Sequence, residues 1–214
     1  MLLGLVLLYV GAVLVINGIW LVGQAYAAAP APAPAGPGEP VLAGGDVPAT
    51  PRRRAEDLPV FISNREVAIL NIFTGFVGVV AAVTLAIHGN QHADIAEIRA
   101  AAYILLFAFT YLWVAYNQFQ ATFVNGHAFG WYCLFVALTA IFAGTYSFVD
   151  ANGNSASIYL GFDWFAWAIL WGMFFVLLAL ERPIALVTGY VAILEGIGTS
   201  WVFALLLLQD KLSF

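Results

Sequence analysis

Residues 100–149 read AAAYILLFAFTYLWVAYNQFQATFVNGHAFGWYCLFVALTAIFAGTYSFV, a stretch without a single Asp, Glu, Lys or Arg. A helix crosses about 30 Å of hydrocarbon with about 20 apolar residues. The stretch is too long for one such helix, and the polar, turn-prone segment 117–130, with Asn125-Gly126-His127, interrupts it. The sequence therefore predicts two membrane-spanning helices here, over about residues 99–122 and 128–149.

Similar apolar runs lie on both sides of this stretch. No charged residue occurs in 1–24, 67–87 or 164–180, and Glu195 is the only charge between Arg182 and Asp210. These runs predict four more spans, over about residues 2–23, 66–88, 163–181 and 184–208. The strands of a membrane β-barrel alternate in polarity over about ten residues, whereas these runs are continuously apolar. We therefore predict an all-α polytopic membrane protein, a single six-helix bundle over residues 1–214.

The composition excludes a soluble globular enzyme. Hydrophobic residues make up 63% of the chain and charged residues 9%, against about 25% charged in a typical soluble domain. Most of the surface must therefore face lipid. There is no basic patch for nucleic acid, and a single cysteine, Cys133, excludes an intrachain disulfide and a cysteine-based zinc site. Without a nucleotide-binding, zincin or hydrolase motif, the sequence predicts no catalytic residue, cofactor or metal.

The few basic residues predict the orientation. Arg52, Arg53, Arg54, Arg65 and Arg182 lie in the first and fifth loops. The second loop has only Arg99 and the C-terminal tail only Lys211. By the positive-inside rule the odd-numbered loops are cytoplasmic, so both termini of this inner-membrane protein face outward.

The segment 27–59 is rich in Ala, Pro and Gly and has no apolar periodicity. We predict a disordered or polyproline-II cytoplasmic loop. Ala25-Tyr26-Ala27 resembles a signal-peptidase site, but no basic residue precedes the apolar run, which also exceeds the usual 7–15 residues of a signal core. Gly4, Gly11 and Gly18 recur every seven residues, and such a stripe lets helices approach closely in lipid. We therefore expect the first helix to be retained.

Glu195 is the most unusual residue, because a carboxyl near the middle of a span costs on the order of 2.5–3.5 kcal/mol. Thr199 lies one turn along on the same face, and no intramembrane Lys or Arg could neutralise the charge. Glu195 is either a hydrogen-bond acceptor or proton site on a water-filled path, or a structural anchor between helices. The amides of Asn17 and Asn117 must likewise find a partner or face a cavity.

Two aromatic stripes run along predicted helices at one-turn spacing. One holds Phe109, Trp113 and Tyr116/Asn117 and continues to Gln120. The other holds Trp164, Trp167/Ala168, Trp171 and Phe174/Phe175. Either stripe lines a pore or packs between helices. His88 and His92 lie at a helix end on the predicted outer side, which makes them candidates for a modest pH response. Solvated loop histidines are the commoner explanation.

Several separated blocks make the chain resemble the AmiS/UreI family of urea and short-amide channels. They cover residues 2–11, 17–19, 109–117, 131–137, 163–172 and 192–196. The resemblance implies a six-helix protomer with outward-facing termini, in a ring of six whose centre is filled with lipid. It implies one pore per protomer with two narrow constrictions, lined by Val10, Leu14, Phe109, Trp113, Trp164, Trp171, Phe174 and Phe175, and it matches Glu195 to the family's intramembrane glutamate.

The same resemblance implies a passive channel that supplies a cytoplasmic urease or amidase with urea or short-chain aliphatic amides. Phe175, Trp113 and Ala168 depart from the aromatic pattern of the acid-gated urea channels, which puts urea selectivity in doubt and leaves room for a longer amide. The outer loops carry few titratable groups, so we expect weak or absent acid gating. Two alternatives remain open: a proton-coupled amide transporter that uses Glu195, and a non-transporting membrane sensor or scaffold.

Overall fold

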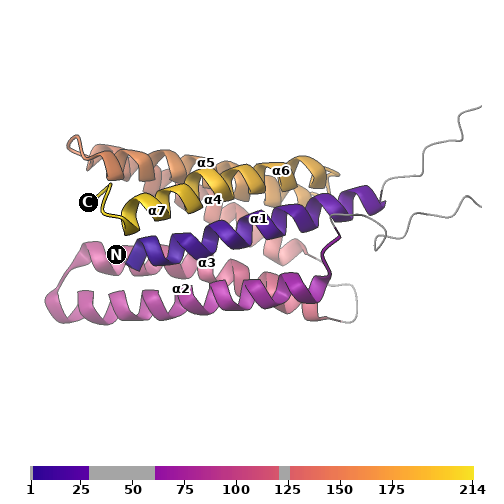
Figure 1. Cartoon of the computed structure of the whole chain (residues 1–214), viewed down its shortest axis with the longest axis horizontal. Helices are drawn as coiled ribbons and strands as arrows, with labels where there is room; N and C mark the ends of the chain where they lie inside the picture. Colours follow the sequence, from indigo (N-terminus) through magenta and orange to yellow (C-terminus); the bar gives the residue numbers. More distant parts are fainter. Residues whose placement is uncertain (1, 29–60, 121–125) are drawn as a thin grey trace, which may run out of the picture.

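The computed structural model describes residues 2–28, 61–120 and 126–214, and within these ranges six helical spans are long and apolar enough to cross a membrane (Figure 1). The first five are α1 (Leu2–Ala28), α2 (Asn64–His92), α3 (Ile95–Phe119), α4 (His127–Val149) and α5 (Ser155–Leu178). The sixth combines α6 (Ala185–Glu195), the π-helix η2 (Gly196–Val202) and α7 (Phe203–Leu208). The prediction of an all-α bundle with six spans is therefore confirmed.

The helix ends differ from the predicted ranges where polar side chains cap them. The Ser63 hydroxyl accepts from the Glu66 backbone N–H while the Glu66 carboxylate accepts from the Ser63 N–H, a capping box that starts α2. Asp94 caps α3 in a similar way, by accepting from the N–H groups of residues 96 and 97. The Asn154 side chain accepts from Ser157 N at 2.9 Å, so α5 begins at Ser155 rather than near residue 163.

The predicted loop 27–59 overlaps the first helix by two positions. Helix α1 continues to Ala28, so the start of that segment is helical rather than disordered. The rest of the predicted loop lies outside the described residues.

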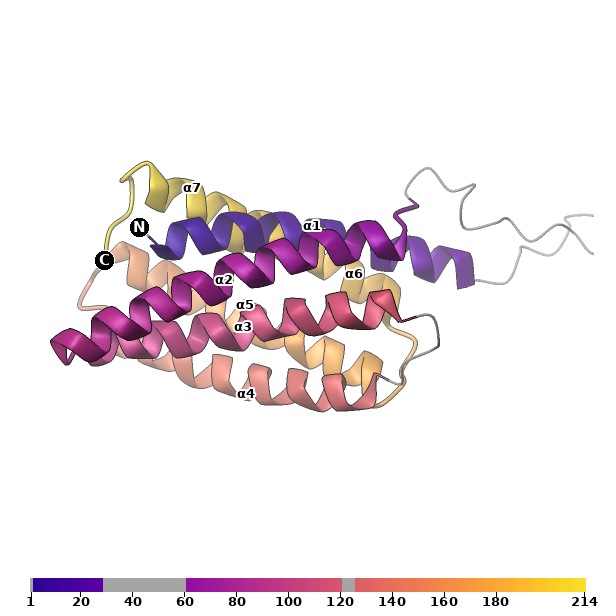
Figure 2. The ribbon, with the colours of Figure 1, turned by 90° about the horizontal axis from the view of Figure 1, so that it is seen from below.

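The six spans pack as three pairs: α1 with α6–η2–α7, α2 with α3, and α4 with α5. In Figures 1 and 2 all of them run along the long axis of the molecule. In the first pair the two backbones approach closely: a Cβ atom on Gly18 would lie 2.6 Å from the carbonyl oxygen of Gly189, and one on Gly11 would lie 2.8 Å from the backbone nitrogen of Trp201. The glycine stripe therefore brings two helix backbones together.

Both termini lie at the same end of the bundle (Figure 1). The short connections from α2 to α3 and from α4 to α5 also lie there, and we call this end the terminal end. An even number of antiparallel spans requires this arrangement. The loops at the terminal end are therefore residues 93–94, between α2 and α3, and residues 150–154, between α4 and α5.

Candidate solute pathway

A cavity of about 630 Å³ occupies the space between the three helix pairs. At the terminal end its lining includes Glu97 and the exposed residues Arg99, Asp150 and Phe214, and we call this part of the cavity its mouth. Deeper in, its lining is aliphatic and aromatic. The inner lining includes Leu3, Val6, Leu7, Val10 and Leu14 of α1, Tyr103, Ile104, Phe107 and Tyr111 of α3, and Leu160, Trp164, Trp167, Leu170 and Trp171 of α5.

Aromatic rings from α3 and α5 form one wall of this cavity. Trp164, Trp167 and Trp171 are spaced three and four residues apart, which places them on one face of α5. Their ring centroids lie 5.5, 5.3 and 5.8 Å, respectively, from that of Phe107. All three tryptophans are at most 5% exposed. The wall is therefore fixed by ring packing across two helix pairs.

A second space of about 20 Å³ lies beyond the cavity. Its lining is Leu14, Asn17, Tyr111, Val114, Phe129, Trp171, Phe174 and Ala192. Leu14, Tyr111 and Trp171 line both spaces and thus form the constriction between them. One water molecule needs about 10–15 Å³ by this measure, so the second space holds about one water. A larger solute can pass only when side chains at the constriction move.

Polar groups that lie at or near the constriction include the Trp171 indole and a pair of amides. Trp171 Nε1 is buried and has no hydrogen-bond partner within the described chain. The amides of Asn17 and Asn71 pair reciprocally: Asn17 Nδ2 donates to Asn71 Oδ1 at 3.1 Å, and Asn71 Nδ2 donates to Asn17 Oδ1 at 2.7 Å. Asn17 therefore has the partner that an amide in lipid requires, and it also borders the second space.

Glu195 lies behind the aromatic wall rather than in the cavity. It is 9% exposed and lines neither of the two spaces. Trp167 Nε1 donates to Thr199 Oγ1 at 2.8 Å, and Thr199 Oγ1 donates to the Glu195 carbonyl oxygen at 2.7 Å. Thr199 therefore connects the glutamate's backbone to a cavity tryptophan without reaching the cavity itself.

Besides Glu195 and Thr199, the structure places four of the predicted pore residues away from both spaces. Phe109 is 50% exposed on the outer face of α3. Trp113 packs against Phe129 and Tyr132 of α4. Phe175 packs against the exposed Trp131. Asn117 is partly buried, with Oδ1 unpartnered within the described residues, and borders neither space.

The helical register of α3 explains why Phe109 and Trp113 lie away from the two spaces. Phe107 and Tyr111 are four residues apart and share the inner face of α3, whereas Phe109 is two residues from each and points the other way. The sequence-based prediction left out Phe107 and Tyr111, and it placed Trp167 in the aromatic stripe of the fifth span without naming it as a pore residue. The spacing of Phe107 and Tyr111 was a usable signal, because it matches that of Trp167 and Trp171 on the facing helix.

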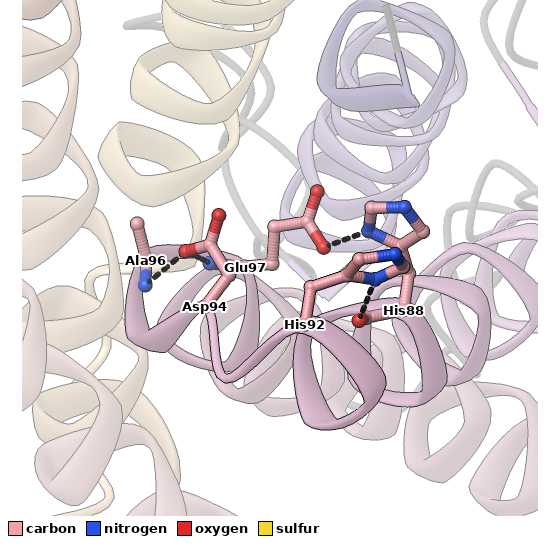
Figure 3. Close-up of polar contacts among 5 residues, drawn as sticks. All are labelled: His88, His92, Asp94, Ala96 and Glu97. Carbon is pink, nitrogen blue, oxygen red and sulfur yellow. Dashed lines mark hydrogen bonds and ion pairs between the residues drawn. The ribbon is translucent and has the colours of Figure 1, made fainter.

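The two predicted histidines lie at the terminal end of α2 (Figure 3). His88 Nδ1 lies 2.5 Å from Glu97 Oε2, and His92 Nδ1 donates to the His88 carbonyl oxygen at 2.8 Å. The two imidazole rings lie 4.1 Å apart. Since Glu97 lines the cavity mouth, His88 reaches the mouth through this carboxylate.

The mouth also holds an ion pair between two helix pairs. Arg99 Nη1 of α3 lies 3.7 Å from Asp150 Oδ2, just after α4. Both side chains are exposed, so screening by water keeps the pair weak. It marks the place where charged groups end and the apolar lining of the cavity begins.

Comparisons with known proteins agree with this geometry. Residues 60–211 match the family described as AmiS/UreI family transporter. A protein of Mycolicibacterium smegmatis, whose name assigns it to the transport of amidate substrates, is 34% identical over 209 residues, covering 97% of this chain and 77% of the relative. The acid-activated urea channel of Helicobacter pylori is 28% identical, with 96% of each chain covered. The crystal structure of the urea channel from that organism matches with a TM-score of 0.74 at 27% identity, over 100% of both chains.

Proposed function

The chain belongs to the AmiS/UreI family of transporters, and from this premise we propose that it is a passive channel for urea and short-chain aliphatic amides. The family match, the names of the relatives and the six apolar spans support this function and exclude an enzyme. One observation carries the proposal: a cavity of about 630 Å³ opens at one end of the bundle and narrows between Leu14, Tyr111 and Trp171.

The lining of the cavity suits flat, neutral solutes. Urea and small amides are planar and uncharged, so they can slide along aromatic faces at a modest desolvation cost. Ions would lose their hydration shell, and among the described residues no charged side chain lines the inner part of the cavity to replace it. Weak contacts to several rings allow fast release, as a conducting pathway requires.

The position of Glu195 favours a channel over a proton-coupled transporter. A coupling carboxyl must be reached by both the proton and the solute path, whereas Glu195 borders neither described space. The sequence has no nucleotide-binding motif. We therefore expect solutes to move only down their own gradient.

We extend the proposal to the assembly and its surroundings. The protein is expected to form a ring of six in the bacterial cytoplasmic membrane, with a pore in each protomer and both termini outside. The excess of arginine in the odd-numbered loops supports this orientation. A cytoplasmic urease or amidase would consume the solute and so maintain the inward gradient.

Acid gating is expected to be weak. His88 and His92 are the titratable imidazoles near the cavity mouth among the described residues, and only Glu97 connects them to it. The loop after α4 carries Asp150 and no histidine. A His88→Ala/His92→Ala double variant should therefore conduct like the parent protein at acidic and neutral pH.

The decisive experiment is stopped-flow permeability of proteoliposomes to urea, acetamide and propionamide, with protein-free vesicles as the control. We expect facilitated entry of at least one of these solutes, with a rate that rises almost linearly with concentration. An imposed proton gradient should leave both the rate and the end point unchanged.

Two outcomes would contradict the proposal. Accumulation of solute above its outside concentration under an inward proton gradient would indicate a coupled transporter. Permeability equal to that of empty vesicles for all three solutes, with folded protein verified in the same vesicles, would indicate a sensor or scaffold.

A further inference from the structure

Two buried acidic side chains lie behind the aromatic wall, and we call them the carboxyl pair. Asp163 is on α5, and Glu195 ends α6 where η2 begins. They are 2% and 9% exposed, respectively, and neither lines the cavity or the smaller space. The pair is therefore distinct from the solute pathway described above.

Each member of the pair has one oxygen that accepts no hydrogen bond from any described residue. Asp163 Oδ2 and Glu195 Oε2 are buried and have no hydrogen-bond partner within the described chain. The two side chains are close enough for their charges to interact. No Lys, Arg or His of the described residues forms an ion pair with either carboxyl.

Two ionised carboxylates whose charges interact are strongly unfavourable in such a buried place. Burying even one unpaired charge costs many kcal/mol, and a second like charge adds repulsion. A single proton removes one of the two charges and supplies the donor that an orphaned oxygen lacks. We propose that Asp163 and Glu195 hold one proton between them, directly or through one bound water.

The pair is placed to control the position of Trp167. Glu195 accepts, through its carbonyl oxygen, from Thr199, and Thr199 accepts from Trp167 Nε1. Helix η2 begins directly after Glu195, and π-helical segments are rare and frequent at functional sites. Repulsion between two ionised carboxylates would displace Glu195 and, with it, the indole that forms part of the cavity wall. Asp163 and Glu195 are thus positioning residues for Trp167.

The groups around the pair leave few other candidates for the proton. Tyr159 of α5 lies near Asp163 and donates its hydroxyl proton to the Gly198 carbonyl oxygen at 2.7 Å. Thr199 and Ser200 of η2 contribute only hydroxyl groups, 3.4 Å apart. Among the described residues, the proton can therefore be exchanged only between the two carboxyls of the pair.

The test is infrared spectroscopy of the reconstituted full-length protein at neutral pH, in ordinary and heavy water. A protonated carboxyl absorbs separately from a carboxylate, and its band shifts on deuteration. We expect one such band in the parent protein. It should shift or vanish in Asp163→Asn and in Glu195→Gln, and be absent from the double variant. The matched control Asp210→Asn, which changes an exposed carboxyl, should leave it unchanged.

A band that is missing from the parent protein, or that persists in the double variant, would overturn the proposal. If the double variant does not fold, the two single variants still test the proposal. An unshifted band in both of them would show that the protonated carboxyl is neither Asp163 nor Glu195. The spectrum requires no transported solute, so its outcome is independent of the proposed channel function.

A transport measurement tests the positioning role. As the pH rises into the alkaline range, loss of the shared proton should change the solute flux of the parent protein. The double variant, which has no carboxyl to ionise, should show a flat profile. A pH dependence that is identical in the two proteins would assign the pair a purely structural role.

Discussion

Leu14 lies where the two internal spaces meet, and it is 3% exposed. Leu14→Ala removes three carbon atoms from the constriction and should raise the permeability ratio of propionamide to urea. The larger solute gains more, because it needs more side-chain movement to pass. Parallel stopped-flow traces with both solutes measure this ratio.

The matched control is Leu5→Ala, on the same helix but 40% exposed. It should leave the ratio unchanged. Core Leu→Ala changes cost about 2–5 kcal/mol, so rates are compared per folded protein after size-exclusion chromatography. A ratio that moves equally in both variants would show that Leu14 does not limit passage.

Trp171 Nε1 is a buried donor without a partner at the same constriction. A passing urea or amide can accept a hydrogen bond from it through its carbonyl oxygen. Trp171→Phe keeps an aromatic ring but removes this donor, and one net hydrogen bond is worth about 0.5–1.5 kcal/mol. Acetamide flux should therefore fall by up to about tenfold, while water permeability changes little.

Trp131→Phe is the corresponding control, because this tryptophan is 58% exposed and borders neither space. It should conduct acetamide like the parent protein. If Trp171→Phe also does so, the indole N–H makes no contact with the solute during passage, and the constriction selects by shape alone.

At the scale of the helices, the contact between α1 and α6 depends on the absence of side chains. A Cβ on Gly18 would lie 2.6 Å from the Gly189 carbonyl oxygen, so Gly18→Ala must push two backbones apart. Overpacking of this kind costs about 1–3 kcal/mol. The midpoint of thermal unfolding in detergent should fall, whereas Gly172→Ala, where a Cβ meets nothing within 4 Å, should not lower it. Equal midpoints would contradict the close contact.

The sequence predicted the number of spans well, because a long, continuously apolar run satisfies its backbone hydrogen bonds in lipid only as a helix. The use of charge-free runs also explains why the predicted start of α5 was too late. Charges served as boundaries, so Asp163 was taken to mark the beginning of the fifth span. Asn154 in fact caps the helix two turns earlier, and Asp163 is buried inside the bundle. Helix boundaries predicted from charged residues are wrong where a membrane protein buries an ionisable side chain inside a span.

The candidate pathway was predicted less completely than the spans. Along α5 and α1 the predicted residues Trp164, Trp171, Val10 and Leu14 line the cavity. On α3 the cavity is lined by Phe107 and Tyr111, about half a turn away from the predicted Phe109. Both faces of a helix in lipid are apolar, so composition does not distinguish the side that faces the pathway from the side that faces lipid. Phe107 and Phe109 are equivalent in the sequence and opposite in the structure.

For the whole molecule, the three helix pairs combine a charged mouth with an uncharged interior. Glu97, Arg99 and Asp150 carry charges at the mouth, whereas the lining from Leu7 inward to Tyr111 carries none. A charged solute can therefore approach the mouth, but no charged side chain replaces its hydration shell deeper in the cavity. The molecule should select by charge even between solutes of the same shape.

Guanidinium tests this property, because it is planar and close to urea in size but carries a positive charge. Cation–π contact with the tryptophans would contribute about 2 kcal/mol, far less than the tens of kcal/mol that full dehydration of an ion costs in a medium of low dielectric constant. We expect urea to enter proteoliposomes quickly and guanidinium to enter no faster than it enters empty vesicles. Guanidinium entry at a rate near that of urea would mean that water fills the open cavity and hydrates the solute throughout, in which case the aromatic wall would act only as a sieve for size.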